Sequence, residues 1–281
     1  MLADPASRGL HLELRGRRRY WVRPAGTKSE GRDTALHEHA RGLAGSTGRR
    51  NPKLTLYHAE KLRKDLDSVV GPHVKLSDLK AAFTPDGFQT KIHTARVDHE
   101  NGKATLSLAM SISKDGKPAG IINRTVQRDK KGRLIVHHEA FDLDPEFQGH
   151  GAAKSVMRKS LIAYEKAGVH AVHVDATDVG RYTWASMGFR ASSEIGDLTL
   201  PTARAKLGEY IDKIGLSAYR KELLAKAPDL PEIAALTHNG RPIGREFLLH
   251  DGQPRLDIWS GELRIDRADP YYQHARHKLG L

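Results

Sequence analysis

The segment of residues 133–189 reads RLIVHHEAFDLDPEFQGHGAAKSVMRKSLIAYEKAGVHAVHVDATDVGRYTWASMGF, and it organises the rest of the chain. Its apolar run at residues 134–143 is typical of a strand. A polar corner at residues 144–146 and a glycine-containing turn at residues 148–153 follow, and then a segment with the apolar period of a helix runs to Gly168. The expected order is therefore strand, glycine turn and helix.

The turn at residues 148–153, QGHGAA, is suited to bind an anion. The first backbone N–H groups of a helix have no partner within the helix, and they point outward at the positive end of the helix dipole. Two glycines let the backbone approach an anion without a Cβ in the way. A glycine turn also connects strand and helix in many α/β units that bind no ligand. The turn alone leaves both interpretations open.

The pattern Gln-x-x-Gly-x-Ala between a strand and a helix resembles the acyl-CoA loop of the GNAT family of N-acetyltransferases. A second motif, WASMGF at residues 184–189, lies where that family has Tyr-x-x-x-Gly-Phe at the end of its next helix. The resemblance covers residues 104–205 at most. It implies an α/β (α+β) fold with a mixed, mostly antiparallel central sheet flanked by helices.

The resemblance also implies an acyl-CoA donor, with acetyl-CoA expected, whose pyrophosphate lies on the loop and whose pantetheine arm follows the strand that ends at Leu143. In this interpretation the backbone N–H of Leu143 polarises the thioester carbonyl. The residues expected to contact the donor are Leu143, Gln148, Gly149, His150, Gly151, Ala152 and Ala153.

Two catalytic candidates, His137 and Glu139, lie on the strand before the loop, where relatives often carry a general base. They are two residues apart, so we expect both on one face of the strand and His138 on the other. The alternative is that His137 and Glu139 form a hydrogen-bonded pair on a polar sheet surface. Trp184 departs from the family pattern, because relatives often have a tyrosine there that protonates the departing thiolate, and indole cannot act as an acid.

Turn signals predict the sheet independently of the resemblance. Residues 100–102, 114–117 and 130–132 each contain a hairpin-type turn, which gives four antiparallel strands ending in residues 134–143. We expect residues 169–176 to form a strand parallel to that one, because a helix lies between them. Other expected elements are an amphipathic helix at residues 54–70, a helix that begins near Ser77, a short helix capped by Asp178, and a strand that starts at Phe189.

Helical periodicity dominates the C-terminal part, with helices expected at residues 199–214, 217–225 and 229–236 and short strands at residues 246–250 and 263–265. In the family the last strand follows the Gly-Phe strand directly, so these helices predict an insertion. The expected organisation is a basic N-terminal extension at residues 1–53, a GNAT-like domain at residues 54–200, and a helical insertion and C-terminal extension at residues 201–281.

The charge of +12 favours acidic partners, and residues 1–53 carry much of it, with 12 Lys and Arg against 5 Asp and Glu. Arginines interleaved with Tyr20 and Trp21 at residues 15–23 are typical of single-stranded nucleic-acid binders, so this arm is a candidate contact for tRNA or another nucleic acid. The alternative is a solvated basic tail. A short strand is expected at residues 10–14 and a linker at residues 42–48.

The composition narrows the function classes. The 281 residues include no cysteine, which excludes disulfides and cysteine nucleophiles and suits a reducing cytoplasm. No apolar run approaches the roughly 18 residues that a membrane span needs. The 16 histidines lack metal-ligand spacing, including the nearby His37 and His39, so we expect no metal. The sequence thus favours an acyl-CoA-dependent N-acyltransferase; the alternative is a non-catalytic GNAT-like binding or assembly module of the phage-head or secreted-toxin type.

Overall fold

The computed structural model describes residues 11–15, 18–22, 63–100, 103–177, 179–192, 200–253, 256 and 258–281. The chain divides into two compact units, Met1–Asn51 and Pro52–Leu281. In the first unit, β1 (His11–Arg15) and β2 (Arg18–Val22) pair as an antiparallel hairpin, which confirms the strand expected near residue 10. The linker expected at residues 42–48 lies outside the described residues, and the nucleic-acid contact expected of residues 15–23 stays a prediction. Residues 54–62 and the proposed cap Asp178 also lie outside the described residues.

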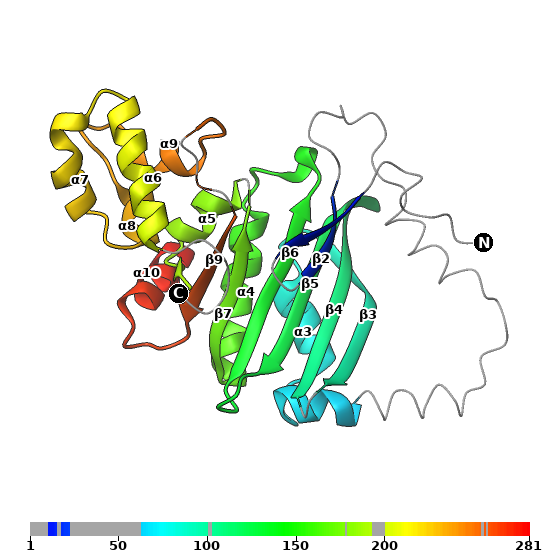
Figure 1. Ribbon diagram of the computed structural model, residues 1–281. Coiled ribbons are helices and arrows are strands. Elements are labelled where there is room, and N and C mark those ends of the chain that lie inside the picture. Colours follow the sequence, from blue (N-terminus) through cyan, green and yellow to red (C-terminus); the bar gives the residue numbers. More distant parts are fainter. Residues whose placement is uncertain are drawn as a thin grey trace. The chain divides into compact units, whose positions relative to one another are not determined.

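The second unit is built on a seven-stranded sheet of order β3-β4-β5-β6-β7-β9-β8 (Figure 1). The strand bounds are β3 (Gln89–Glu100), β4 (Lys103–Lys114), β5 (Lys117–Arg128), β6 (Leu134–Leu143), β7 (Val169–Ala176), β8 (Arg190–Ala191) and β9 (Trp259–Arg264). The β6–β7 pair is parallel, and the other pairs are antiparallel. This confirms the mixed, mostly antiparallel sheet, the four-stranded meander and the parallel fifth strand that the sequence predicts.

The first helix described in this unit spans residues 63–70, which is the C-terminal part of the helix expected at residues 54–70. The remaining helical elements are α3 (Leu76–Phe83), η2 (Pro145–Phe147), α4 (Ala152–Ala167), α5 (Gly180–Ser186), α6 (Leu200–Lys213), η3 (Ser217–Tyr219), α7 (Arg220–Ala225), α8 (Leu230–Ala235), α9 (Ile243–Leu248) and α10 (Pro270–Leu279).

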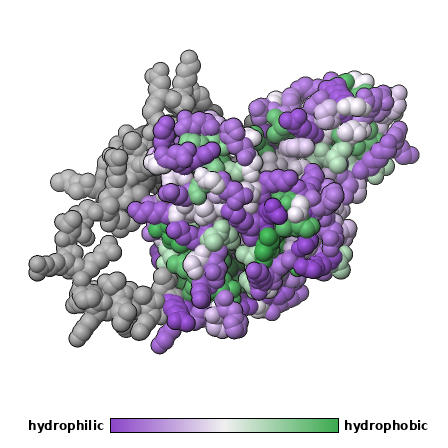
Figure 2. Space-filling model, turned by 180° about the vertical axis from the view of Figure 1, so that it is seen from behind, coloured by the Kyte–Doolittle hydropathy of each residue, from purple (hydrophilic) through white to green (hydrophobic). Residues whose placement is uncertain are grey.

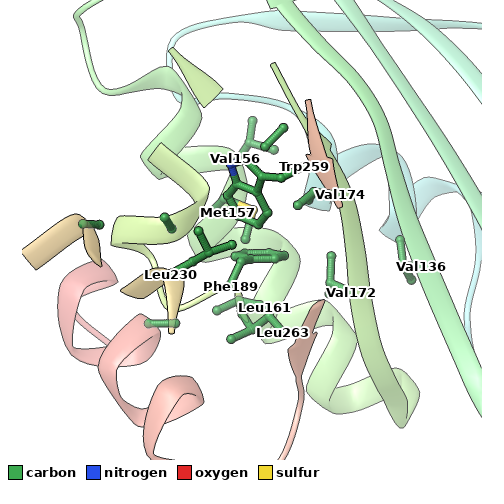
Figure 3. Packing of buried hydrophobic residues seen from close by; sticks show 14 of the residues in the cluster. Val136, Val156, Met157, Leu161, Val172, Val174, Phe189, Leu230, Trp259 and Leu263 are labelled. Carbon is green, nitrogen blue, oxygen red and sulfur yellow. The ribbon is translucent and has the colours of Figure 1, made fainter. Parts of the chain in front are cut away.

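Alternate strand residues build the core, because successive side chains of a strand point to opposite faces. On β4 the buried residues are Leu106, Leu108, Met110 and Ile112, with polar or small residues between them. Helix α4 covers the apolar face, where its Met157 and Leu161 pack near Val172 and Val174 of β7 (Figure 3). Each such fully buried aliphatic side chain contributes about 1.5–3 kcal/mol relative to exposure.

Helices α3 and α4 lie side by side on the same face of the sheet, behind it in the view of Figure 1. Their outer surface, on the side seen in Figure 2, carries mostly hydrophilic residues with hydrophobic residues in small separate patches. Among the described helices, none is long and apolar enough to cross a membrane. The sheet therefore has one face packed under helices and one face that carries polar side chains.

Helices α6 to α9 follow β8 and precede β9, so four helices interrupt the sheet where the sequence predicts a helical insertion. The chain then returns, and β9 enters the sheet between β7 and β8. One expectation here is wrong: residues 246–250 do not form a strand. They belong mostly to α9, whose buried residues Ile243, Gly244, Phe247 and Leu248 come as two adjacent pairs one helical turn apart. A strand would bury alternate residues instead.

Candidate active site

Strands β6 and β7 stop pairing before either strand ends. Their parallel register runs from Leu134 and Val169 to His138 and Val174. Beyond this pair β6 continues along β5 to Leu143, whereas the end of β7 pairs with β9 on its other side. We call this place, after His138 and Val174, the divergence point. It leaves the edge of β6 from residue 139 onward without a strand partner among the described residues.

The backbone at the end of β6 presents a donor to that unpaired edge. The N–H of Asp144 donates to the carbonyl of Ala119 next to β5 at 2.9 Å. Consecutive residues of an antiparallel strand alternate between facing the partner and facing away, so the N–H of Leu143 points to the opposite edge. Gly120, the register partner of Leu143, has no room for a side chain, since a Cβ there would lie 2.1 Å from the carbonyl oxygen of Asp142.

The glycine turn between η2 and α4 is open to solvent. Gly149 and Gly151 have φ of 80° and 78°, a left-handed conformation that glycine adopts without strain, and a Cβ on either would meet nothing within 4 Å. Gly151 caps α4 without any side-chain hydrogen bond, so the first amides of the helix keep their outward direction. Along this turn the predicted donor contacts are exposed at Gln148, Gly149, His150 and Gly151, half-buried at Ala153 and buried at Ala152.

Gln148 has a structural contact that the sequence did not predict. Its side-chain Nε2 donates to the carbonyl oxygen of Leu143 at 2.6 Å. The bond ties the start of the glycine turn to the last residue of β6. Leu143 and the turn are therefore held together by the protein itself.

Glu139 lies in a β-bulge directly after the divergence point. The β5–β6 register passes from Arg124 and His138 to Asn123 and Ala140, so it skips Glu139, which is exposed. Arg124 is 1% exposed, and its Nη1 donates to the carbonyl oxygens of Ala140 at 2.6 Å and Asn123 at 2.8 Å. The buried guanidinium thus joins the backbones of β5 and β6 directly after the bulge.

The bulge affects the expectation that His137 and Glu139 share a face. Strict alternation does not extend across an extra residue, so their common face stays a prediction. The two side chains also differ in burial, because His137 is 9% exposed and Glu139 is exposed. The expectation that His138 points to the other face from His137 agrees with its contact to α4.

His137 belongs to a polar row across the face of the sheet away from α4. Its Nε2 lies 3.0 Å from Nε2 of Gln127 on β5, and its ring meets the ring of His173 on β7 edge to face at 4.9 Å between centroids. Nε2 of His173 lies 3.4 Å from Oε2 of Glu262 on β9. The contacts of Glu262 with His173 and with Arg264 lower the pKa of Glu262 to about 2. The row therefore ends in a carboxylate that stays charged.

The opposite face carries a buried polar cluster just below the divergence point. His138 Nε2 lies 2.7 Å from the hydroxyl of Tyr164 on α4, and its ring meets the indole of Trp184 at 5.7 Å between centroids. Burial, with the charge of Arg124 as the next cause, holds the pKa of His138 well below its ordinary value, so the imidazole is neutral. Burial raises the pKa of Tyr164 and lowers that of Arg124 to about 10. Nδ1 of His138 and Nε of Arg124 have no hydrogen-bond partner among the described residues.

The Gly-Phe motif after α5 fixes the other side of this cluster. Phe189 is fully buried, and its ring lies 5.1 Å from that of Trp184. Gly188 has φ of 97°, and a Cβ there would lie 2.6 Å from the carbonyl oxygen of Tyr271. Trp184 is therefore clamped between a core phenylalanine and His138, in the place where the family pattern has its tyrosine.

Sequence reasoning missed His173, Glu262, Arg124 and Tyr164 as members of these clusters. The sequence does contain a signal for Arg124, because buried residues alternate along β5 and Arg124 stands at one of these positions, between Ile122 and Val126. His173 and Glu262 left none, since their meeting with His137 depends on the register of strands far apart in sequence. No group of three or more His, Asp or Glu in the described ranges is arranged to hold a metal ion.

Residues 77–197 match the family model described as acetyltransferase (GNAT) domain. No curated protein matches the chain. Six solved chains match it, and one of them, entitled "Crystal structure of Nourseothricin acetyltransferase", is 20% identical, covers 42% of this chain and 81% of its own, and has a TM-score of 0.26. Residues 77–197 therefore form an acetyltransferase domain of the GNAT family.

Proposed function

We propose that the protein is an acyl-CoA-dependent N-acyltransferase that transfers an acyl group, with acetyl as the expected case, to a primary amine. The observation that carries the proposal is the separation of β6 from β7 beside an exposed glycine turn, inside a domain that matches the acetyltransferase family model. The separation frees a strand edge for an extended ligand, and the turn offers helix-end amides to its phosphates.

The donor pyrophosphate would contact residues 148–153. The outward amides at the start of α4 and the positive end of the helix dipole attract it. Lys154 and Arg158 add two exposed cations on the first turns of the same helix. The Gln148 bond to Leu143 keeps the turn in register with the strand edge that the pantetheine arm would follow.

The acyl carbonyl would lie beside the N–H of Leu143, which stabilises the negative charge that develops on its oxygen as the amine attacks. Glu139 is the base that the geometry favours, because it is exposed at the bulge beyond the divergence point, whereas His137 is buried and in contact with Gln127 and His173. In the transfer the amine nitrogen bonds to the acyl carbon, the carbon–sulfur bond breaks, and Glu139 takes the amine proton directly or through a water.

The departing thiolate would find no acid at Trp184. His138 lies against that indole, and its neutral ring accepts from Tyr164 at Nε2 when Nδ1 carries the hydrogen. A neutral imidazole N–H can stabilise an anion without giving up its proton. The thiolate would then take its proton from water.

Calorimetry with acetyl-CoA on a matched pair of variants tests donor binding. Gly151→Asn tolerates the left-handed backbone and adds no charge, whereas Gly151→Asp adds a negative charge of similar size beside the phosphates. We expect Gly151→Asp to bind at least about a hundredfold more weakly than Gly151→Asn, since like charges in contact cost several kcal/mol. Equal affinities would remove the glycine turn from the donor site.

Turnover is tested separately by following CoA release from acetyl-CoA in the presence of a panel of primary amines. Release that depends on the amine supports the transferase. Tight donor binding with no acylated amine in any member of the panel would instead support the non-catalytic binding module. The contribution of the basic arm to a nucleic-acid acceptor stays a prediction, tested by deleting residues 1–53 and measuring the salt dependence of RNA binding.

A further inference from the structure

A cavity of about 590 Å³ lies at the end of the sheet remote from the glycine turn. Its floor is formed where β6 and β7 begin, by Leu134, Gly168 and Val169, and Ile265 closes one side. Helix α4 separates it from the turn: 16 residues at 1.5 Å per residue give about 24 Å. The cavity therefore does not belong to the candidate active site.

The polar groups around this cavity are mostly hydrogen-bond donors. Arg128 donates from Nη1 to the carbonyl of Gly132 at 2.8 Å and forms no ion pair among the described residues. Nη1 of Arg133 lies 2.8 Å from Nε2 of His170, and because arginine only donates, His170 must accept there and carry its hydrogen on Nδ1. Burial, and then the charge of Arg133, lowers the pKa of His170 below its ordinary value, which agrees with a neutral ring.

Positive charge exceeds negative charge at this end of the molecule. The Glu165 carboxylate forms ion pairs with Arg267, at 3.1 Å, and with Arg276, and it accepts a hydrogen bond from the hydroxyl of Tyr272 at 2.7 Å. The Asp129 carboxylate forms an ion pair with Arg133 at 2.6 Å. Four guanidinium groups against two carboxylates leave a net charge of +2, from Arg128, Arg133, Arg267, Arg276, Asp129 and Glu165. The C-terminal end of α4 offsets only about half a charge.

We propose that this cavity binds the phosphate group of a second, phosphorylated ligand. Arg128 and Arg267 both line the cavity and both are exposed. Arg267 uses only Nη2 for its bond to Glu165, so its remaining N–H groups and those of Arg128 can approach one phosphate while that ion pair is kept. A phosphate offers three acceptor oxygens to such forks, and bidentate arginine bonds of this kind are among the strongest hydrogen bonds in proteins. The apolar floor accommodates the uncharged part of the ligand.

The test uses the full chain with Gly151→Asp, which disables the proposed donor site, and inorganic phosphate as the probe. Phosphate is titrated while the ring signals of His170 are followed by NMR, with His170→Asn identifying them among the other histidines. We expect saturable shifts of the His170 signals. Adding Arg128→Gln and Arg267→Gln should weaken binding by about tenfold or more, because two charged hydrogen-bond donors to the phosphate are lost.

The matched control removes the same charge elsewhere, with Lys64→Gln and Lys221→Gln on the exposed surfaces of the first helix and α7. It should bind phosphate as the parent does. A single Arg128→Gln, which breaks no ion pair, should weaken binding on its own. Unshifted His170 signals, or equal affinity in the cavity variant and the control, would overturn the proposal.

A second arm separates the two sources of a phosphate group. A short single-stranded oligonucleotide that displaces inorganic phosphate from the cavity, with affinity that falls steeply with salt, identifies a nucleic-acid backbone. Displacement by a sugar phosphate and none by the oligonucleotide identifies a small phosphorylated molecule. Both results depend on the same arginines, and failure of either acyl-CoA binding or transfer leaves them unchanged.

Discussion

The two ends of helix α4 differ in the hydrogen bonds that their backbone and side chains form. At the N-terminal end, Gly151 caps the helix without a side-chain hydrogen bond, and open space surrounds the turn. At the other end, the N–H of Gly168 donates to the carbonyls of Tyr164 and Glu165. The side chain of Glu165 there accepts hydrogen bonds from Arg267, Tyr272 and Arg276. One end leaves donors for a ligand, and the other anchors α10 to the helix. Free backbone donors thus lie at the first end, and the side-chain contacts that hold α10 lie at the second.

The largest expected effect lies at the first end. Glu139→Gln keeps the size of the side chain and removes the base, so turnover of acetyl-CoA with an amine should fall by about 10²–10⁴-fold, with little change in donor affinity. His137→Gln should cost less than about tenfold, because His137 is buried in contact with Gln127 and His173, whereas Glu139 is exposed. A rate that is lost in His137→Gln and kept in Glu139→Gln would move the base to the buried histidine.

The second effect concerns stability at the opposite end. Glu165→Gln leaves Arg276 without its carboxylate and should lower the free energy of unfolding by about 1.5–3 kcal/mol, as urea denaturation would measure. Glu222→Gln is the control, since its pair with Lys226 is more than half exposed on both sides and should contribute less than about 1 kcal/mol. Equal losses in both variants would show that Glu165 does not anchor α10.

The pH dependence of unfolding sharpens this result. Burial raises the pKa of Glu165, but hydrogen bonds from Tyr272, Arg267 and Arg276 outweigh it and bring the value from 4.5 to about 2. A lowered folded-state pKa stabilises the protein above the unfolded value, so this contribution is complete above about pH 4.5 and is lost as the pH falls through about 2. The wild type should therefore lose more stability across this window than Glu165→Gln does.

The smallest expected effect compares the two glycines that end the helix. Gly151 and Gly168 have φ of 78° and 65° with open space around each, so an alanine at either position should cost about 1 kcal/mol of strain. Only Gly151→Ala should also weaken acetyl-CoA binding, as calorimetry would detect. Weakened binding in Gly168→Ala would mean that the two ends are coupled through the helix.

The sequence predicted most of the sheet because local turn chemistry specifies it. Three turn signals placed four strands, and β6 and β7 begin and end where their apolar runs do. It failed at residues 246–250, where a short apolar run fits strand and helix equally, and burial against the neighbouring helices decided for helix. The insertion before the last strand was predicted, but nothing local indicated that β9 would lie inside the sheet.

The candidate site was only partly predictable for the same reason. The glycine turn is a local motif, and its left-handed glycines follow from QGHG itself. The bulge at Glu139 depends on a buried arginine of the neighbouring strand, and the row from His137 to Glu262 joins strands β6, β7 and β9. Such contacts depend on register between distant segments, which a pattern along one segment does not contain.

The place of β9 in the sheet bears on how the protein folds during synthesis. Ser260 of β9 bonds to Asp175 of β7 at 2.7 Å across 85 residues of chain, so a ribosome delivers β7 long before its neighbour. Until then β7 keeps an unpaired edge, and unpaired edges are where strands of different chains join. A recombinant fragment cut at residue 197 would carry the matched domain and keep this exposed edge permanently, without Trp259 and Leu263 to complete its core. The helices between β8 and β9 therefore set how long this edge of β7 stays unpaired during synthesis.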